Sequence, residues 1–183
     1  MPKTHSKHTH IHLTKQEMIR GEKLCRRKIE TLWRKNMRVE ALMYMSLLIE
    51  HFLKESIFEF EQILEGSAIS MHVAFNPRRL YSRDDLENQP LGYLIKVLEA
   101  YTVDNNLIMD LRRFSKVRNE CIHKLFGQKI SIVNRKLTGF DKFFYELVVR
   151  LVQLLLSQIE HKKKHFNWIC DPCFQEVRKQ VKL

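Results

Sequence analysis

The sequence predicts an all-α protein, an antiparallel helical bundle of about five helices. Apolar residues recur at steps of three and four over several long stretches, which is the spacing of one face of a helix. The 183 residues include only five Gly and four Pro, and no segment alternates convincingly as a strand does. We expect a flexible His-rich tail over 1–13, one helical domain over 14–165 and a C-terminal extension over 166–183.

The first two helices are the most clearly marked. Thr14-Lys-Gln-Glu17 is a capping box, because a hydroxyl precedes a carboxylate by three positions, and it predicts a helix over 15–36. This helix has few apolar residues among many basic ones, so it should lie on the surface. Leu42, Met45 and Ile49 begin a strongly apolar helix over 38–65, and Gly66 should end it.

The rest of the chain should contain three more helices. After an irregular segment over 66–89, which carries Arg78, Arg79 and Arg83, we expect helices over 90–101, 104–126 and 140–164. Residues 130–133 could form a short extended connection. The last helix is the richest in paired apolar residues and should be the most buried.

Positive charge is concentrated at the two ends of the chain. The net charge is +11, of which +8 lies in residues 1–38 and +3 in residues 160–183, while residues 39–159 are neutral. Such ends suit a polyanion, most simply nucleic acid, and the alternative is a solvated face that maintains solubility. The candidate RNA-binding residues are Arg26, Arg27, Lys28, Arg34, Lys35, Arg112 and Arg113.

The sequence favours a cytoplasmic protein that does not enter the membrane. Residues 1–12 are polar and do not resemble a signal peptide, and the longest apolar run, Ala41 to Met45, is far shorter than the roughly 20 residues of a membrane span. The chain has four cysteines, and in a protein expected to be cytoplasmic they argue against a disulfide framework.

The stretch Leu111-Arg-Arg-Phe-Ser-Lys-Val-Arg118-Asn119-Glu-Cys-Ile-His123 carries the clearest functional motif. An Arg followed by Asn, with a His at Arg-x4-His spacing on a helix, resembles the signature of the HEPN superfamily of all-α bundles. Val39-Glu-Ala-Leu and Leu91-Gly-Tyr-Leu-Ile are similar to segments of HEPN proteins of the mannitol-repressor kind. The resemblance covers residues 38–160. Leu125 stands where the antitoxin-paired members have a Tyr.

The resemblance implies a homodimeric, metal-independent endoribonuclease, with a cognate regulator or antitoxin as a candidate partner. His123 would act as the acid or base, Arg118 as the phosphate clamp, and Asn119 would orient His123 or the phosphate. The alternative that the resemblance implies is a non-catalytic regulatory or interaction module of the same fold. An unrelated alternative is a basic protein that docks on DNA or an acidic partner through helix 15–36.

The geometry of a helix determines which motif residues can point toward the same ligand. Arg118 and His123 lie about 140° apart around a helix axis at ~100° per residue, so one copy should be half of a site. A second copy across a two-fold axis could supply the other half. The structural alternative is that Arg118 pairs with Glu120, Asp110 or Glu50, and that His123 interacts with the end of its own helix.

A second constellation lies near the C-terminus, at His161-x3-His165-x4-Cys170-Asp-Pro-Cys173. Two His one turn apart and a Cys-x2-Cys pair are the ligand types and number of a tetrahedral structural zinc site. The alternative is an exposed helix end with half-buried cysteines. His8, His10 and His12 could likewise bind a metal, although a disordered tail is the simpler interpretation.

Overall fold

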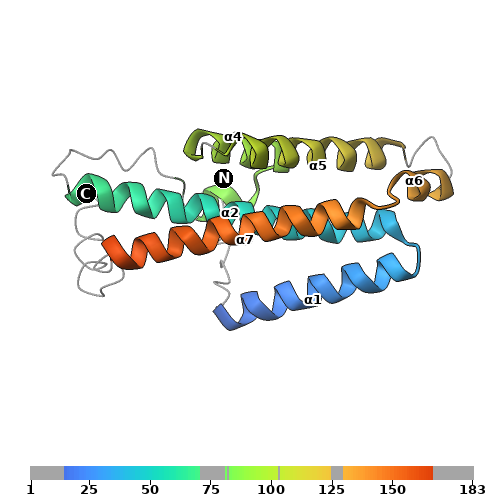
Figure 1. Cartoon of the computed structure of the whole chain (residues 1–183), viewed down its shortest axis with the longest axis horizontal. Helices are drawn as coiled ribbons and strands as arrows, with labels where there is room; N and C mark the ends of the chain where they lie inside the picture. Colours follow the sequence, from blue (N-terminus) through green and yellow to red (C-terminus); the bar gives the residue numbers. More distant parts are fainter. Residues whose placement is uncertain (1–14, 71–80, 82, 103, 125–129, 167–183) are drawn as a thin grey trace, which may run out of the picture.

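A computed structural model of the chain describes residues 15–70, 81, 83–102, 104–124 and 130–166. The described residues are all-α, as expected, and form seven helices rather than five, with no strand (Figure 1). No helix among them is long and apolar enough to cross a membrane. The helices are α1 (Lys15–Arg34), α2 (Arg38–Ser70), α3 (Arg83–Glu87), α4 (Leu91–Tyr101), α5 (Asn105–Lys124), α6 (Ile130–Lys136) and α7 (Phe140–His165).

Helix α2 is the centre of the fold. It packs against α7, α1 and α4, and α5 also contacts both α2 and α7 (Figure 1). Leu42, Met45 and Ile49 on α2 are fully buried, as apolar residues at three- and four-residue steps should be. The expectation that the last helix is the most buried was wrong, because α7 buries only Phe144, Leu147, Val148, Leu151 and Gln158, whereas α2 buries residues along most of its length.

The helices form three levels in Figure 1. The antiparallel pair of α4 and α5 lies above α2 and α7, and α1 lies below them. A short connection, residues 102–104, joins α4 to α5, which favours this antiparallel arrangement. The motif helix α5 is therefore on the opposite side of the bundle from the basic helix α1.

Two local predictions were wrong. Helix α2 continues through a buried Gly66 to Ser70, instead of ending there. A glycine inside a helix costs only about 1 kcal/mol relative to alanine, and the packing around this turn can offset that cost. Residues 130–133 are not extended, because they form the first half of α6.

Helix α6 contributes a cap to the central helix. The side-chain oxygen of Asn134 accepts hydrogen bonds from the backbone N–H groups of Arg38 (3.1 Å) and Val39 (3.2 Å), at the start of α2. The guanidinium of Arg38 in turn donates to the Asn134 carbonyl (2.8 Å) and to the Thr138 hydroxyl (2.6 Å). These contacts hold α6 and the turn before α7 against the beginning of α2.

A buried polar contact joins α4 to the second half of α2, and sequence reasoning missed it. The Tyr101 hydroxyl donates to a carboxylate oxygen of Glu61, and the Tyr101 ring stacks on Phe60 at 5.7 Å. Burial raises the pKa of Glu61, and burial together with this hydrogen bond raises the pKa of Tyr101. Glu61 is one of several glutamates of α2, so nothing in the sequence singled it out.

Candidate nucleic-acid-binding helix

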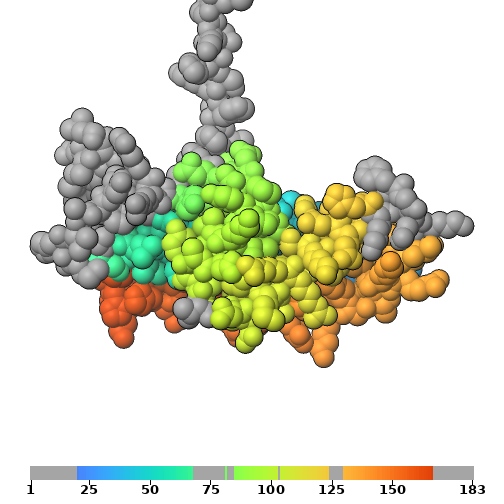
Figure 2. Space-filling model, turned by 90° about the horizontal axis from the view of Figure 1, so that it is seen from above, coloured from blue at the N-terminus to red at the C-terminus, as the bar shows by residue number. Residues whose placement is uncertain are grey.

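Helix α5 has two faces with different composition. Leu107, Leu111, Phe114 and Cys121 are buried against the bundle. The opposite side, which we call the outer strip, consists of exposed polar or basic residues and one methionine. Figure 2 looks onto the side of the molecule formed by α4 and α5. The members of the outer strip are Asn105, Met109, Arg112, Arg113, Lys116, Asn119 and His123, and the acidic Glu120 is exposed among them.

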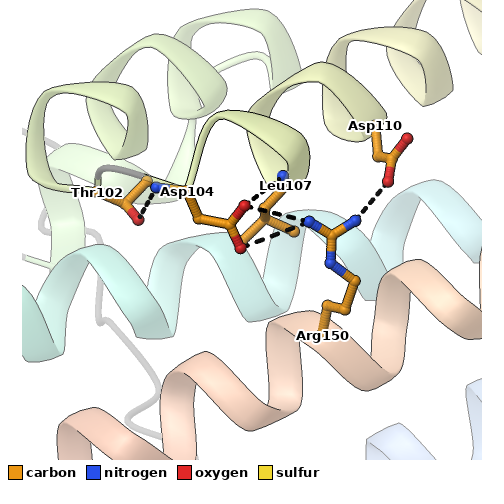
Figure 3. A network of polar contacts seen from close by, with 5 residues as sticks. All are labelled: Thr102, Asp104, Leu107, Asp110 and Arg150. Atoms are coloured by element: carbon orange, nitrogen blue, oxygen red, sulfur yellow. Dashed lines mark hydrogen bonds and ion pairs between the residues drawn. The ribbon is translucent and has the colours of Figure 1, made fainter.

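The beginning of α5 is held by a polar network (Figure 3). An Asp104 side-chain oxygen accepts from the Leu107 N–H at 2.9 Å, and therefore caps the helix. Arg150 on α7 forms ion pairs with Asp110 (2.5 Å) and with Asp104 (3.3 Å). The guanidinium thus links one end of α5 to the neighbouring helix.

The two arginines of the outer strip also have partners within the chain. Arg112 donates to both carboxylate oxygens of Glu99 on α4, each at 2.7 Å. Arg113 lies over the ring of Phe143 on α7, 4.7 Å from its centroid, which is a cation–π distance. Both remain exposed, so each can offer a cation to a phosphate while keeping its position.

Arg118 occupies an unusual position for an arginine. It follows the buried Phe114 by four residues and therefore lies on the packed face of α5. The side chain is half-buried, its Nε is buried without a hydrogen-bond partner, and Nη1 donates to the side-chain oxygen of Asn119 at 3.2 Å. No carboxylate of the described residues forms an ion pair with it, and Asp110 pairs with Arg150 instead.

Asn119 and His123 lie one turn apart on the outer strip, and both are exposed. His123 makes no ion pair or hydrogen bond within the described part of the chain, whereas Arg118 lies toward the packed face. The structure therefore brings Arg118 next to Asn119 but does not direct Arg118 and His123 at one point.

The other candidate RNA-binding residues are separate from this surface. Arg27, Lys28, Arg34 and Lys35 are exposed on or just after α1, whereas Arg26 is half-buried and pairs with Glu22 at 2.9 Å. Since α1 lies on the far side of α2 and α7, its basic residues and the outer strip do not share one surface of a single chain (Figure 1). Sequence position alone could not reveal this separation.

The candidate metal ligands are described only in part. His161 and His165 are exposed on the last turn of α7, with ring centroids 4.6 Å apart. Cys170, Cys173, the tail over 1–13, Arg78 and Arg79 lie outside the described residues. Among those described, no three His, Cys, Asp or Glu side chains are grouped to hold a metal ion.

Comparison with known proteins adds no family. No family model matches the sequence, and no curated protein or solved structure matches it significantly. The class that the fold and the site define is thus an all-α protein with an exposed basic strip on one helix.

Proposed function

We propose that the protein is a HEPN-like, RNA-directed protein that binds RNA along the outer strip of α5. One observation carries the proposal. Lys116, Asn119 and His123 are exposed on one helix face, and neither Lys116 nor His123 has a partner within the described residues. Lysine binds phosphates as a point charge, and an exposed amide or imidazole can donate to a phosphate or a ribose hydroxyl.

We further propose that a homodimer cleaves the bound RNA without a metal ion. RNA supplies its own nucleophile, the 2′-hydroxyl, so the protein needs a group that moves a proton and a cation that offsets phosphate charge. His123 would move the proton, Arg118 would hold the phosphate, and Asn119 would keep Arg118 in place through their hydrogen bond. Because Arg118 and His123 diverge in one chain, His123 of one copy would work with Arg118 of the other.

A non-catalytic RNA-binding module is the second candidate. It is favoured by the inward position of Arg118, whose buried Nε leaves only part of its guanidinium for a ligand. A cognate protein regulator would then cover the same strip. The third candidate is docking on DNA or an acidic partner through α1. It would be favoured if α5 were wholly packed, but the outer strip of α5 is exposed.

The decisive experiment is incubation of the purified protein with RNA in excess EDTA. His123→Ala should lower the cleavage rate by about 100-fold or more, since proton transfer by a positioned side chain contributes on the order of 10²–10⁴. Arg118→Ala should act similarly, and Lys142→Ala, an exposed lysine on α7, should cleave at the wild-type rate. Equal product from wild type and His123→Ala would refute the cleavage mechanism.

A binding measurement separates the two candidates. Lys116→Ala should weaken RNA binding for all sequences and reduce the slope of log affinity against log salt by about 1, the signature of one lost phosphate contact. Binding without cleavage would support the non-catalytic module. If Lys116→Ala and Lys142→Ala bind RNA equally well, the outer strip is not the binding surface.

A further inference from the structure

One end of the bundle gathers basic residues from segments that are far apart in the sequence. Residues 31–39 include the end of α1 and the start of α2, and residues 130–140 include α6. Together the two segments contain five Arg or Lys residues and no Asp or Glu. We call these five residues the end patch: Arg34, Lys35, Arg38, Arg135 and Lys136. The three helices meet at the same end of the bundle (Figure 1).

A network of hydrogen bonds holds the two segments of the end patch together. Asn134 caps the start of α2, and the Arg38 guanidinium donates to the Asn134 carbonyl and to the Thr138 hydroxyl. Arg135 and Lys136 directly follow Asn134 in α6. The end patch is therefore produced by tertiary packing, since Arg38 and Thr138 are 100 positions apart in the sequence.

The charges of the end patch are not neutralised within the part of the chain that the structure describes. Arg38 is half-buried, uses Nη1 for both of its hydrogen bonds, and has a buried Nε without an acceptor. The other four side chains are exposed, and none of them forms an ion pair with a described carboxylate. The carboxylates closest in sequence, which also leave these cations unpaired, are Glu30, Glu40 and Asp141. The end patch can therefore attract an anionic group of another molecule.

The outer strip of α5 leads to this end of the bundle. Helix α5 ends at Lys124 beside α6 (Figure 1), and Figure 2 shows the yellow residues of α5 next to orange residues that come later in the chain. Although α1 lies on the other side of α2 and α7, it ends here too (Figure 1). A strand that follows Lys116, Asn119 and His123 along α5 would thus meet α6 next, and then the start of α2.

We propose that the end patch binds the phosphate backbone of RNA where the strand passes beyond His123 and around the end of the bundle. This choice of ligand rests on the proposed function of α5. Arginine holds a phosphate through its planar fork, and lysine binds it as a point charge. Contacts to phosphates carry no sequence information, so the end patch should raise the affinity for any strand long enough to reach it.

Exposed apolar residues at the same end raise the alternative of an anionic membrane surface. Met37 is 38% exposed, Ile132 43% and Ile130 55%, and basic surfaces with apolar residues bind such membranes. RNA is favoured because the end patch lies next to the polar outer strip of α5. In addition, the hydrogen bonds of Arg38 to Asn134 and Thr138 fix its guanidinium in place, as a defined phosphate contact requires.

The test measures how the full chain binds a single-stranded RNA of about 16 nucleotides, with 2′-O-methyl groups so that it is not cleaved. Arg135→Gln with Lys136→Gln should lower the slope of log affinity against log salt by about 1.4, or about 0.7 for each lost phosphate contact. At about 0.1 M salt this change corresponds to an affinity loss of about 25-fold. The loss caused by Lys116→Ala should add to it, because the two surfaces are separate.

Lys163→Gln with Lys164→Gln is the matched control, because it removes the same charge from exposed side chains at the other end of α7. This control should bind RNA as wild type does. No loss in the end-patch variant, or an equal loss in both double variants, would overturn the inference, while a loss in Lys116→Ala would still support the outer strip. A loss in the end-patch variant beside wild-type binding by Lys116→Ala would support the end patch and refute the outer strip.

Vesicles of phosphatidylserine and phosphatidylcholine test the membrane alternative. We expect the two double variants to bind these vesicles equally. Vesicle binding that only the end-patch variant loses, with its RNA binding unchanged, would overturn the inference in favour of a lipid surface. Because Arg135 and Lys136 are exposed, far-ultraviolet circular dichroism of their variant should match wild type, so lost binding can be separated from unfolding.

Discussion

The two halves of α5 use their charged residues in different ways. In the first half, Asp110 pairs with Arg150, Arg112 pairs with Glu99, and Arg113 stacks on Phe143. In the second half, Lys116 and His123 have no partner within the described residues. Within the same described part of the chain, the side-chain hydrogen bond of Arg118 goes to its neighbour Asn119. The fold thus uses Asp110, Arg112 and Arg113 of the first half, and leaves Lys116 and His123 of the second half available to another molecule.

The packed face of α5 also differs between the two halves of the helix. Leu111 and Phe114 fill this face with apolar side chains, and Cys121 does so one turn before the helix ends. Between them, Arg118 places a guanidinium where spacing alone would favour an aliphatic residue. An arginine at such a position is expected to weaken packing, so its presence is better explained by function than by stability.

The largest effect on stability should come from the apolar side of the first half. Phe114→Ala should lower the free energy of unfolding by about 3–5 kcal/mol, because Phe114 is fully buried beside Phe140 and Phe144. Urea denaturation followed by circular dichroism measures this change. His123→Ala in the second half should stay within about 0.5 kcal/mol of wild type. A comparable loss in both variants would remove the distinction between the halves.

A smaller loss should follow from Arg150→Ala. This change leaves Asp110 and Asp104 without their shared cation and should cost about 1–2 kcal/mol, a value reduced because all three side chains are about one third to one half exposed. The loss should diminish in high salt. Lys142→Ala, on the same helix but exposed, is the control. An unchanged unfolding midpoint in Arg150→Ala would mean that the network does not anchor α5.

The elements that the sequence predicted well are those with a local signal. The apolar periodicity of α2, α4 and α7 and the Asn-rich start of α5 located these helices to within a few residues, apart from the end of α2. Helix α6 could not be predicted in this way. Its Asn134 matters because it caps α2, a contact between residues 96 positions apart, which no local window contains.

For the candidate site, the divergence of Arg118 and His123 could be predicted from the sequence, whereas the place of the basic helix α1 relative to them could not. The motif spacing indicated that Arg118 and His123 diverge, and the structure has Arg118 on the packed face and His123 on the outer strip. The position of α1 on the far side of the bundle depends on tertiary packing, so the sequence could not show that its basic residues and the outer strip lie on different sides of one chain (Figure 1). Charge along the chain reports how many cations exist, whereas only packing decides which of them lie together.

Arg118→Leu is expected to change stability only slightly, and it gives the sharpest test because the expected change is an increase. Leucine restores an apolar residue to the stripe of Leu111 and Phe114 and removes a buried Nε that has no acceptor. Replacing an imperfectly satisfied polar group by an apolar one of suitable shape is neutral or stabilising, so the free energy of unfolding should rise by up to ~1 kcal/mol.

The same variant should lose the function that the arginine serves. Arg118→Leu should cleave RNA no better than Arg118→Ala, while Arg118→Lys, which keeps a charge but loses the bidentate fork, should recover binding more than cleavage. A more stable but inactive Arg118→Leu would show that the second half of α5 gives up stability for a ligand. If Arg118→Leu is instead destabilised by more than about 1 kcal/mol, the arginine stabilises the fold. The proposed difference between the two halves of α5 would then be wrong.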